Sequence, residues 1–200
     1  MLKNEVSNIK YNIGCPAKIE KYFKDDEWNE LKNVSSTFLF KIVILLVGAL
    51  ISAFFYQFIK NDIPIDIIIK TYKNNWYLIL ILIPIHEYAH AIIYPKFGLS
   101  DKTIIGFWPK KFVFYAYHDK PMKRNRILLA MLSPLFMLTI VPVLLISILN
   151  LNSVYLAIIT LLNPMAGAGD IFYTILVLKQ VPKNSLVRTD TSRFFCKKED

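Results

Sequence analysis

Four long apolar runs limit what this chain can fold into. They cover Phe38 to Ile59, Trp76 to Pro95, Ile127 to Leu149 and Val154 to Leu178, each about 20 to 25 residues. An α-helix needs this length to cross a hydrocarbon core about 30 Å thick. With 54% hydrophobic residues and a mean hydropathy of +0.40, the chain is too apolar for an ordinary soluble domain. We therefore expect a mainly α-helical, polytopic membrane protein with about four transmembrane helices.

These runs also define the expected domains. Residues 1–37 are predicted to be an N-terminal cytoplasmic tail, residues 38–178 a membrane-embedded domain, and residues 179–200 a C-terminal cytoplasmic tail. The connection at Asn150 to Ser153 is short, which forces the last two runs to be antiparallel. The isoleucine-rich segment Asn61 to Lys70 is too short to span the bilayer, so we expect it to lie at the interface.

The placement of Lys and Arg predicts the orientation in the cell membrane. Six of them lie in the N-terminal tail, eight in residues 96–126 and six in the C-terminal tail, whereas residues 60–75 contain three. Because cytoplasmic loops of membrane proteins are enriched in Lys and Arg, both termini and the middle loop are predicted to be cytoplasmic. The net charge of +9 is then an orientation signal. Binding to nucleic acid would also use positive charge, but no recognisable nucleic-acid module is present, and nothing in the sequence indicates an oligomeric state.

The middle loop contains two segments that predict a β-hairpin near the membrane. Thr103 to Trp108 and Lys111 to His118 flank a turn centred on Pro109, and the second segment alternates between two sets of side chains. An edge strand there would be suited to pairing with an extended segment of a protein substrate. Packing against the helices is an equally good explanation of the hairpin.

The second apolar run contains the sequence His86-Glu87-Tyr88-Ala89-His90. On an α-helix His86 and His90 are about one turn apart on the same face, so both imidazoles can bind one Zn²⁺. Glu87 is then beside the metal, where its carboxylate can act as the catalytic base. A polar cluster that only joins helices is the alternative, but ionisable groups cost about 2.5 to 3.5 kcal/mol each inside a span, which favours a metal site.

Two histidines do not complete a zinc site, so a third ligand is needed. The pattern of soluble metalloproteases that continues to a third histidine fails, because Ile93 and Lys96 occupy the required positions. Asp170 is the one other acidic residue within a predicted span, and it lies at the depth of the two histidines if the spans run as predicted. His118 is the alternative third ligand, although it belongs to the middle loop.

These residues resemble the motifs of a known family. The His-Glu-x-x-His motif in one span and Asn163-Pro164 with Asp170 in a later span are similar to the site-2 protease family of intramembrane zinc proteases. The closer resemblance is to small bacterial proteins called putative zincin peptidases, in which Ser133-Pro134 and Gly169-Asp170 are also familiar. The resemblance implies zinc bound by His86, His90 and Asp170, Glu87 as base, and Asn163 near the substrate backbone. Ile171 stands where the site-2 pattern has glycine.

Together these observations predict a zinc-dependent intramembrane metalloprotease that cleaves transmembrane or juxtamembrane protein substrates. Two alternatives remain. A metal transporter can also have His-Glu-x-x-His in a helix, but three histidines and about four spans leave no second metal site. A proteolytically inactive homologue that binds membrane partners would have the same spans and motifs.

Overall fold

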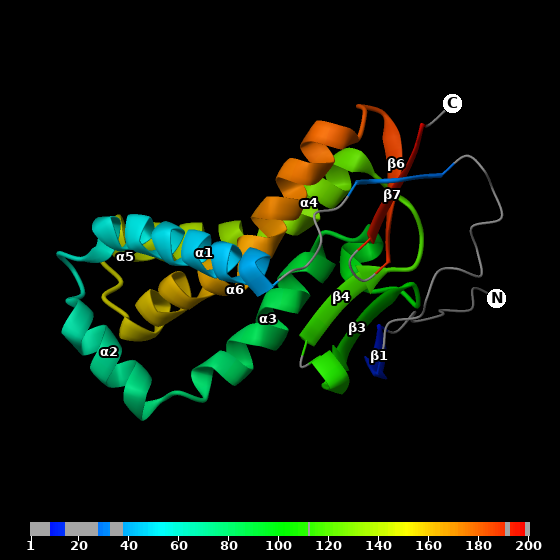
Figure 1. Cartoon of the computed structure of the whole chain (residues 1–200). Helices are drawn as coiled ribbons and strands as arrows, with labels where there is room; N and C mark the ends of the chain where they lie inside the picture. The colour runs from blue at the N-terminus through cyan, green and yellow to red at the C-terminus, as the bar shows by residue number, and fades with distance from the viewer. Residues whose placement is uncertain (1–8, 15–27, 33–37, 112, 191–192, 199–200) are drawn as a thin grey trace. The chain divides into compact units, whose positions relative to one another are not determined.

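The computed structural model describes residues 9–14, 28–32, 38–111, 113–190 and 193–198 (Figure 1). The chain divides into two compact units, which we describe separately. The helical unit comprises Val34–His86 and Met131–Ile175, and the strand-containing unit comprises Met1–Asn33, Glu87–Ala130 and Leu176–Asp200. The boundaries between the units fall inside helices, so three helices run without a break from one unit into the other: α3 (Leu78–Ile92), α4 (Arg124–Leu135) and α6 (Val154–Gln180).

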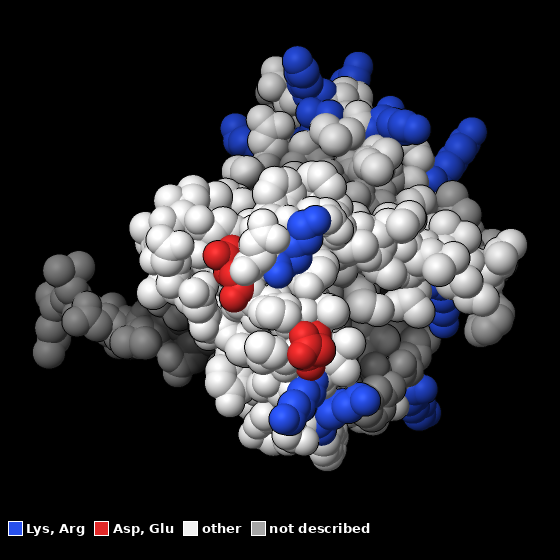
Figure 2. Space-filling view, turned by 90° about the vertical axis from the view of Figure 1, so that its left-hand side faces the viewer, with Lys and Arg blue, Asp and Glu red and all other residues white. Residues whose placement is uncertain are grey.

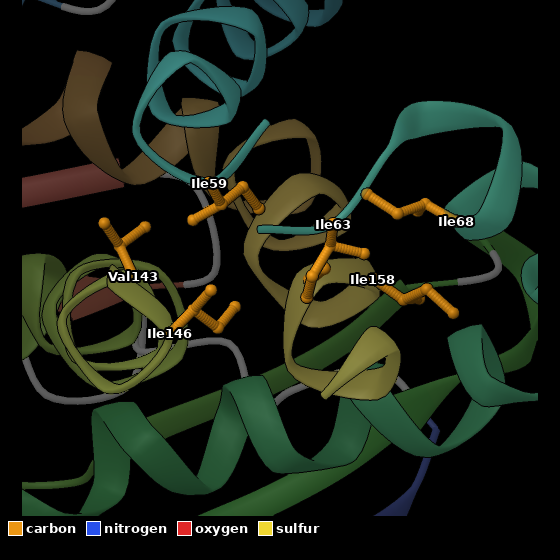
Figure 3. Close-up of a cluster of buried hydrophobic side chains, with 7 residues drawn as sticks. Ile59, Ile63, Ile68, Val143, Ile146 and Ile158 are labelled. Atoms are coloured by element: carbon orange, nitrogen blue, oxygen red, sulfur yellow. The ribbon is translucent and has the colours of Figure 1, made fainter. Parts of the chain in front are cut away.

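The helical unit is built around a core of aliphatic side chains. It also contains α1 (Phe38–Ile59), α2 (Ile65–Asn74) and α5 (Val141–Ser147). A π-helical segment, η4 (Phe136–Ile140), joins α4 to α5 in one continuous helix. Side chains from α1, α2, α5, α6 and the turn after α1 point toward one another in this core (Figure 3). Its buried members are Ile59, Ile63, Ile68, Val143, Ile146, Ala157 and Ile158.

Within the part of the chain that the structure describes, three helices are long and apolar enough to cross a membrane. They are Leu39–Ile59, the α4-to-α5 helix Arg124–Ser147, and Val154–Gln180, and they agree with three of the four predicted spans. Only 17% of the most apolar window of α1 is buried, as expected for a helix that faces lipid. On the face seen in Figure 2, charged side chains are sparse and uncharged side chains cover most of the surface. We conclude that the chain has the features of a membrane protein.

The remaining predicted span, Trp76 to Pro95, corresponds to a helix that is shorter than expected. A count of four spans is therefore not confirmed. The helix, α3, has 15 residues, a length of about 22 Å at 1.5 Å per residue. Bonds between residues three apart, including Leu78 N–H to Asn75 O, form a turn before the helix. At the other end, Tyr94 has an extended backbone (φ −64°, ψ 162°), because a residue before proline disfavours the helical conformation. Local sequence therefore shortens this helix at both ends.

Close contact between α1 and α6 depends on a glycine. A Cβ atom built at Gly48 would lie 2.7 Å from the Cα of Met165 and 2.8 Å from the carbonyl oxygen of Pro164. One turn further along α1, Ser52 Oγ lies 2.7 Å from the carbonyl oxygen of Leu161. Small residues that let backbones approach are typical of helix contacts in membranes, where lipid removes the hydrophobic driving force between helices. This contact fixes the part of α6 around Pro164.

The strand-containing unit includes the predicted β-hairpin. β3 (Thr103–Trp108) pairs antiparallel with β4 (Val113–His118), and the short 3-10 helix η3 (Pro109–Lys111) forms the turn. The edge of β3 is covered by a strand that the sequence did not predict, β1 (Lys10–Ile13), which pairs parallel to it. The hairpin is therefore part of a three-stranded sheet with the order β1-β3-β4.

A second, four-stranded sheet uses both predicted tails. Its order is β2-β7-β6-β5, with all neighbours antiparallel. The strands are β2 (Asn29–Glu30), β5 (Met122–Lys123), β6 (Ser185–Asp190) and β7 (Arg193–Lys198). Val187 and Phe194 are buried in this unit. The charge pattern predicted cytoplasmic tails but contained no indication that these segments form a sheet. The division into two tails and a membrane-embedded domain stays a prediction.

Candidate metal centre

His86 and His90 both lie on α3, four residues apart, and both are buried. The helix is continuous through this segment, so its own geometry places the two imidazoles on one face, about one turn apart. Ala89 and Ala91, which flank His90, are also buried, and small side chains there let the helix pack closely. The sequence pattern His-x-x-x-His thus produces the expected pair on a packed helix face.

A backbone hydrogen bond fixes the proton position of His90. Its Nδ1 lies 2.7 Å from the carbonyl oxygen of Ala130, on α4. A carbonyl oxygen can only accept, so Nδ1 of His90 must donate. In the neutral imidazole the lone pair is then on Nε2, the nitrogen that remains for a metal.

Asn163 fixes the proton position of His86 in the same way. Its amide nitrogen donates to the carbonyl oxygen of Pro134 (3.0 Å) and to Oγ1 of Thr139 (2.9 Å). Because the Pro134 carbonyl can only accept, Asn163 must direct its amide nitrogen there and its Oδ1 toward His86. His86 Nδ1 lies 2.9 Å from this Oδ1 and must donate, which again leaves the lone pair on Nε2. Asn163 is 1% exposed, so water does not compete for these bonds.

The Nε2 atom of His86 faces a carboxylate. Oδ2 of Asp170, on α6, lies 3.1 Å from it, and the Asp170 side chain is partly exposed. Two lone pairs pointing at each other over this distance repel, so a cation is needed between them: a proton or a metal ion. Among the described residues, His86, His90 and Asp170 form a group whose potential ligand atoms all lie within 4.8 Å of one another.

The geometry of this group fits Zn²⁺. Ligand atoms about 2.0 to 2.1 Å from a tetrahedral zinc ion lie about 3.3 Å apart, close to the separation of His86 Nε2 and Asp170 Oδ2. Two imidazoles and one carboxylate are a ligand set found in catalytic zinc sites, which keep the fourth position open. Gly167 preserves this space, because a Cβ atom there would lie 3.0 Å from Cε1 of His86 and 3.3 Å from Oδ2 of Asp170.

Glu87 follows His86 on α3 and is only partly buried. It is not a member of the group of potential ligands found among the described residues. On a helix, consecutive residues are rotated by about 100°, so Glu87 lies at the flank of the face that carries His86 and His90.

His118, the alternative third ligand, has a different environment. It is buried at the end of β4, where its Nδ1 lies 3.1 Å from the carbonyl oxygen of Lys120 and its ring contacts Tyr94. Burial lowers the pKa of His118, which favours the neutral imidazole. It does not join the group that contains His86, His90 and Asp170.

Sequence reasoning did not identify the groups that hold the two histidines. The carbonyl oxygens of Ala130 and Pro134 have no side-chain signature, so no pattern in the sequence indicates them. Thr139 lies in η4, and π-helical segments are frequent at functional sites, but nothing in the sequence marks this one. Gly167 could have been identified from the sequence. It precedes Asp170 by three residues, and residues three apart on a helix lie on the same face.

Comparison with known proteins identifies one family. A family model described as "Putative zincin peptidase" matches residues 79–186, more than half of the chain. The match begins in α3, includes the whole group of potential ligands and ends in β6. No curated protein and no solved structure matches the chain.

Proposed function

The chain belongs to the putative zincin peptidase family, and from this premise we propose that it is a zinc-dependent intramembrane metalloprotease. Its substrates are proteins of the membrane, which it cleaves at peptide bonds in transmembrane or juxtamembrane segments. The family supports a metallopeptidase. Our proposal adds to this that the reaction takes place within the membrane and that the mechanism resembles that of site-2 proteases.

The separation of 3.1 Å between His86 Nε2 and Asp170 Oδ2 is the main support for this proposal. The imidazoles of His86 and His90 donate through Nδ1 to Asn163 and to the carbonyl oxygen of Ala130, which leaves each Nε2 with its lone pair for a metal ion. Such outer hydrogen bonds accompany metal-binding histidines. A polar cluster that only joins helices would not need potential ligand atoms of two histidines and a carboxylate within 4.8 Å of one another.

In the proposed mechanism His86, His90 and Asp170 hold the metal ion. Zn²⁺ bound there would supply a Lewis acid, which polarises a peptide carbonyl and makes water acidic enough to attack near neutral pH. Glu87 takes the proton from the attacking water on its carboxylate and delivers it to the nitrogen of the leaving amine. We propose that Asn163 positions His86, because its burial and three hydrogen bonds leave little capacity to bind a substrate backbone.

The helices support a site inside the membrane. The α4-to-α5 helix and α6 are long enough to span a bilayer, and both contribute residues around His86: Pro134 and Thr139 from the first, Asn163 and Asp170 from the second. Asp170 is ten residues from Gln180, the end of α6, a depth of about 15 Å at 1.5 Å per residue. With the termini and residues 96–126 in the cytoplasm, the site would open toward that side.

Substitution of Glu87 tests the proposed function. We expect Glu87→Gln to abolish cleavage but to retain zinc, because the amide cannot act as a base and residue 87 is not a ligand. The membrane proteome of cells that produce the wild-type protein would be compared with that of cells producing Glu87→Gln, and only wild type should generate cleaved fragments. Identical proteomes from two zinc-loaded proteins would favour an inactive homologue. Loss of zinc from a folded Glu87→Gln protein would mean that the residue roles are wrong.

A further inference from the structure

A cavity of about 700 Å³ lies in the strand-containing unit, where α3 ends and α4 begins. Among the described residues that line it, three are basic (Lys96, Lys123 and Arg126) and none is acidic. All three basic side chains are exposed, and Arg126 is oriented by a hydrogen bond from its Nε to the carbonyl oxygen of Ile93 (3.0 Å). The cavity thus concentrates positive charge at one helix junction.

Most of the other side chains that line the cavity are apolar. Ile92, on the last turn of α3, and Leu129, one turn beyond Arg126 on α4, both line it and are 40% and 62% exposed. Cationic groups next to exposed aliphatic groups in one cavity match a ligand with an anionic head and a hydrocarbon chain.

A strained turn that contains Lys96 and Phe97 forms part of the cavity wall. Lys96 and Phe97 both have left-handed backbones, with φ of 58° and 55°, a conformation that bulky residues rarely adopt. Gly98 secures the turn against α3, because a Cβ atom there would lie 2.5 Å from the carbonyl oxygen of Ala91. The turn leaves Phe97 78% exposed beside the positive charges. Phe together with Lys and Arg is a combination found in segments that lie at the membrane interface.

The position of the cavity along α4 indicates its depth. The helix Arg124–Ser147 has 24 residues, about 36 Å at 1.5 Å per residue, which slightly exceeds the hydrocarbon core. Arg126 lies on its first turn and is therefore expected at the level of the lipid phosphates, and Leu129 just below it. We propose that the cavity is a binding site for an anionic phospholipid, with the phosphate held by Lys96, Lys123 and Arg126 and an acyl chain along Ile92 and Leu129.

Lipid retention by the full chain tests this proposal without reference to proteolysis. The protein would be reconstituted in nanodiscs that contain equal amounts of phosphatidylglycerol and phosphatidylcholine, and the lipids that stay bound after release would be counted by native mass spectrometry. The wild-type protein should retain phosphatidylglycerol in preference to phosphatidylcholine. Because each basic residue near an anionic surface contributes about 1 kcal/mol, the variant Lys96→Gln/Lys123→Gln/Arg126→Gln should reduce this preference by more than about tenfold.

The controls separate a specific site from general charge. Lys60→Gln/Lys70→Gln/Lys73→Gln removes the same charge from α2 and the turn before it and should keep the preference. Lys96→Gln/Lys123→Gln leaves the bond from Arg126 to Ile93 in place and should still reduce the preference if the triple variant fails to fold. An unchanged preference in the folded variants, or an equal loss in the Lys60 control, would overturn the proposal. Full displacement of the lipid by inorganic phosphate alone would also overturn it, because the ligand would then be free phosphate.

Discussion

Nδ1 of His86 donates a hydrogen bond to Oδ1 of Asn163 over 2.9 Å, and Asn163 is oriented in turn by the carbonyl oxygen of Pro134. A chain of two buried hydrogen bonds therefore determines which nitrogen of His86 faces Asp170. Asn163 has no other position available, since its amide nitrogen must point to Pro134 and to Thr139. The orientation of the candidate ligand is thus set by α6 and by the helix that contains η4.

Asn163→Ala should weaken zinc binding by about 10 to 100-fold, the usual effect of losing a hydrogen bond to a metal-binding histidine. Without Oδ1 of Asn163, the proton of His86 can move to Nε2 and compete with the metal. Zinc affinity of the purified protein, measured by competition with a chelator, checks this. Thr139→Ala leaves the Asn163 to His86 bond in place and should have a smaller effect. Normal zinc affinity together with weaker substrate binding in Asn163→Ala would instead favour a role for Asn163 at the substrate backbone.

Asp170→Ala should lower zinc affinity by well over a factor of about ten, because a lost ligand costs more than a lost outer hydrogen bond. Activity should disappear with the metal. The fold should largely persist, since removing a charge from within a span relieves about 2.5 to 3.5 kcal/mol of desolvation cost. The matched variant is His118→Ala, measured for zinc content in detergent. Normal zinc in Asp170→Ala with depleted zinc in His118→Ala would transfer the third ligand to the loop.

The two glycines before Asp170 should respond differently to alanine. Gly167→Ala places a methyl group 3.0 Å from Cε1 of His86, so zinc affinity should fall as the imidazole is displaced. A Cβ atom at Gly169 meets nothing within 4 Å, so Gly169→Ala should retain zinc. Both substitutions favour the helix by up to about 1 kcal/mol, and thermal unfolding of the detergent-solubilised protein controls for that effect. Equal zinc affinities in the two variants would show that the space above His86 is not needed.

The orientation in the membrane can be measured with fused reporters. A reporter after Asp200, or one inserted in residues 110–120, should report the cytoplasm, whereas one near Asn74 should report the opposite side, because Lys and Arg concentrate in the first two regions. A middle loop on the outside would remove the basis for an active site that opens toward the cytoplasm.

The apolar runs predicted the long helices well, because 20 or more apolar residues leave few alternatives to a membrane helix. The length of the apolar run did not predict the length of α3, because local features set the ends of this helix. The turn at Asn75 to Leu78 delays its start, and Pro95 ends it early. The hairpin was predictable because β3 and β4 combine β-branched and aromatic residues with a proline at the turn. Strand β1, Lys-Tyr-Asn-Ile, is only four residues long, too short for a periodic signal.

The sequence likewise predicted some parts of the candidate site and not others. His86, Glu87 and His90 are recognisable because their spacing matches one helical turn. Asp170 could be proposed because it lies in an apolar run, where an ionisable side chain is costly unless it has a function. The bonds to Ala130 and Pro134 could not be predicted, since they use backbone atoms of a helix that is distant in sequence.

The pairing of β2 with β7 constrains the order in which the protein can fold. Asn29 faces Cys196, and Glu30 faces Phe195, so residues that are distant in the sequence share one ladder. The chain must be synthesised at least to Cys196 before these residues can meet, by which time α1 and α6 have been synthesised. Long-range strand pairs of this kind form slowly because they close large loops. The four-stranded sheet is therefore expected to be the last part to assemble, after the helices have inserted.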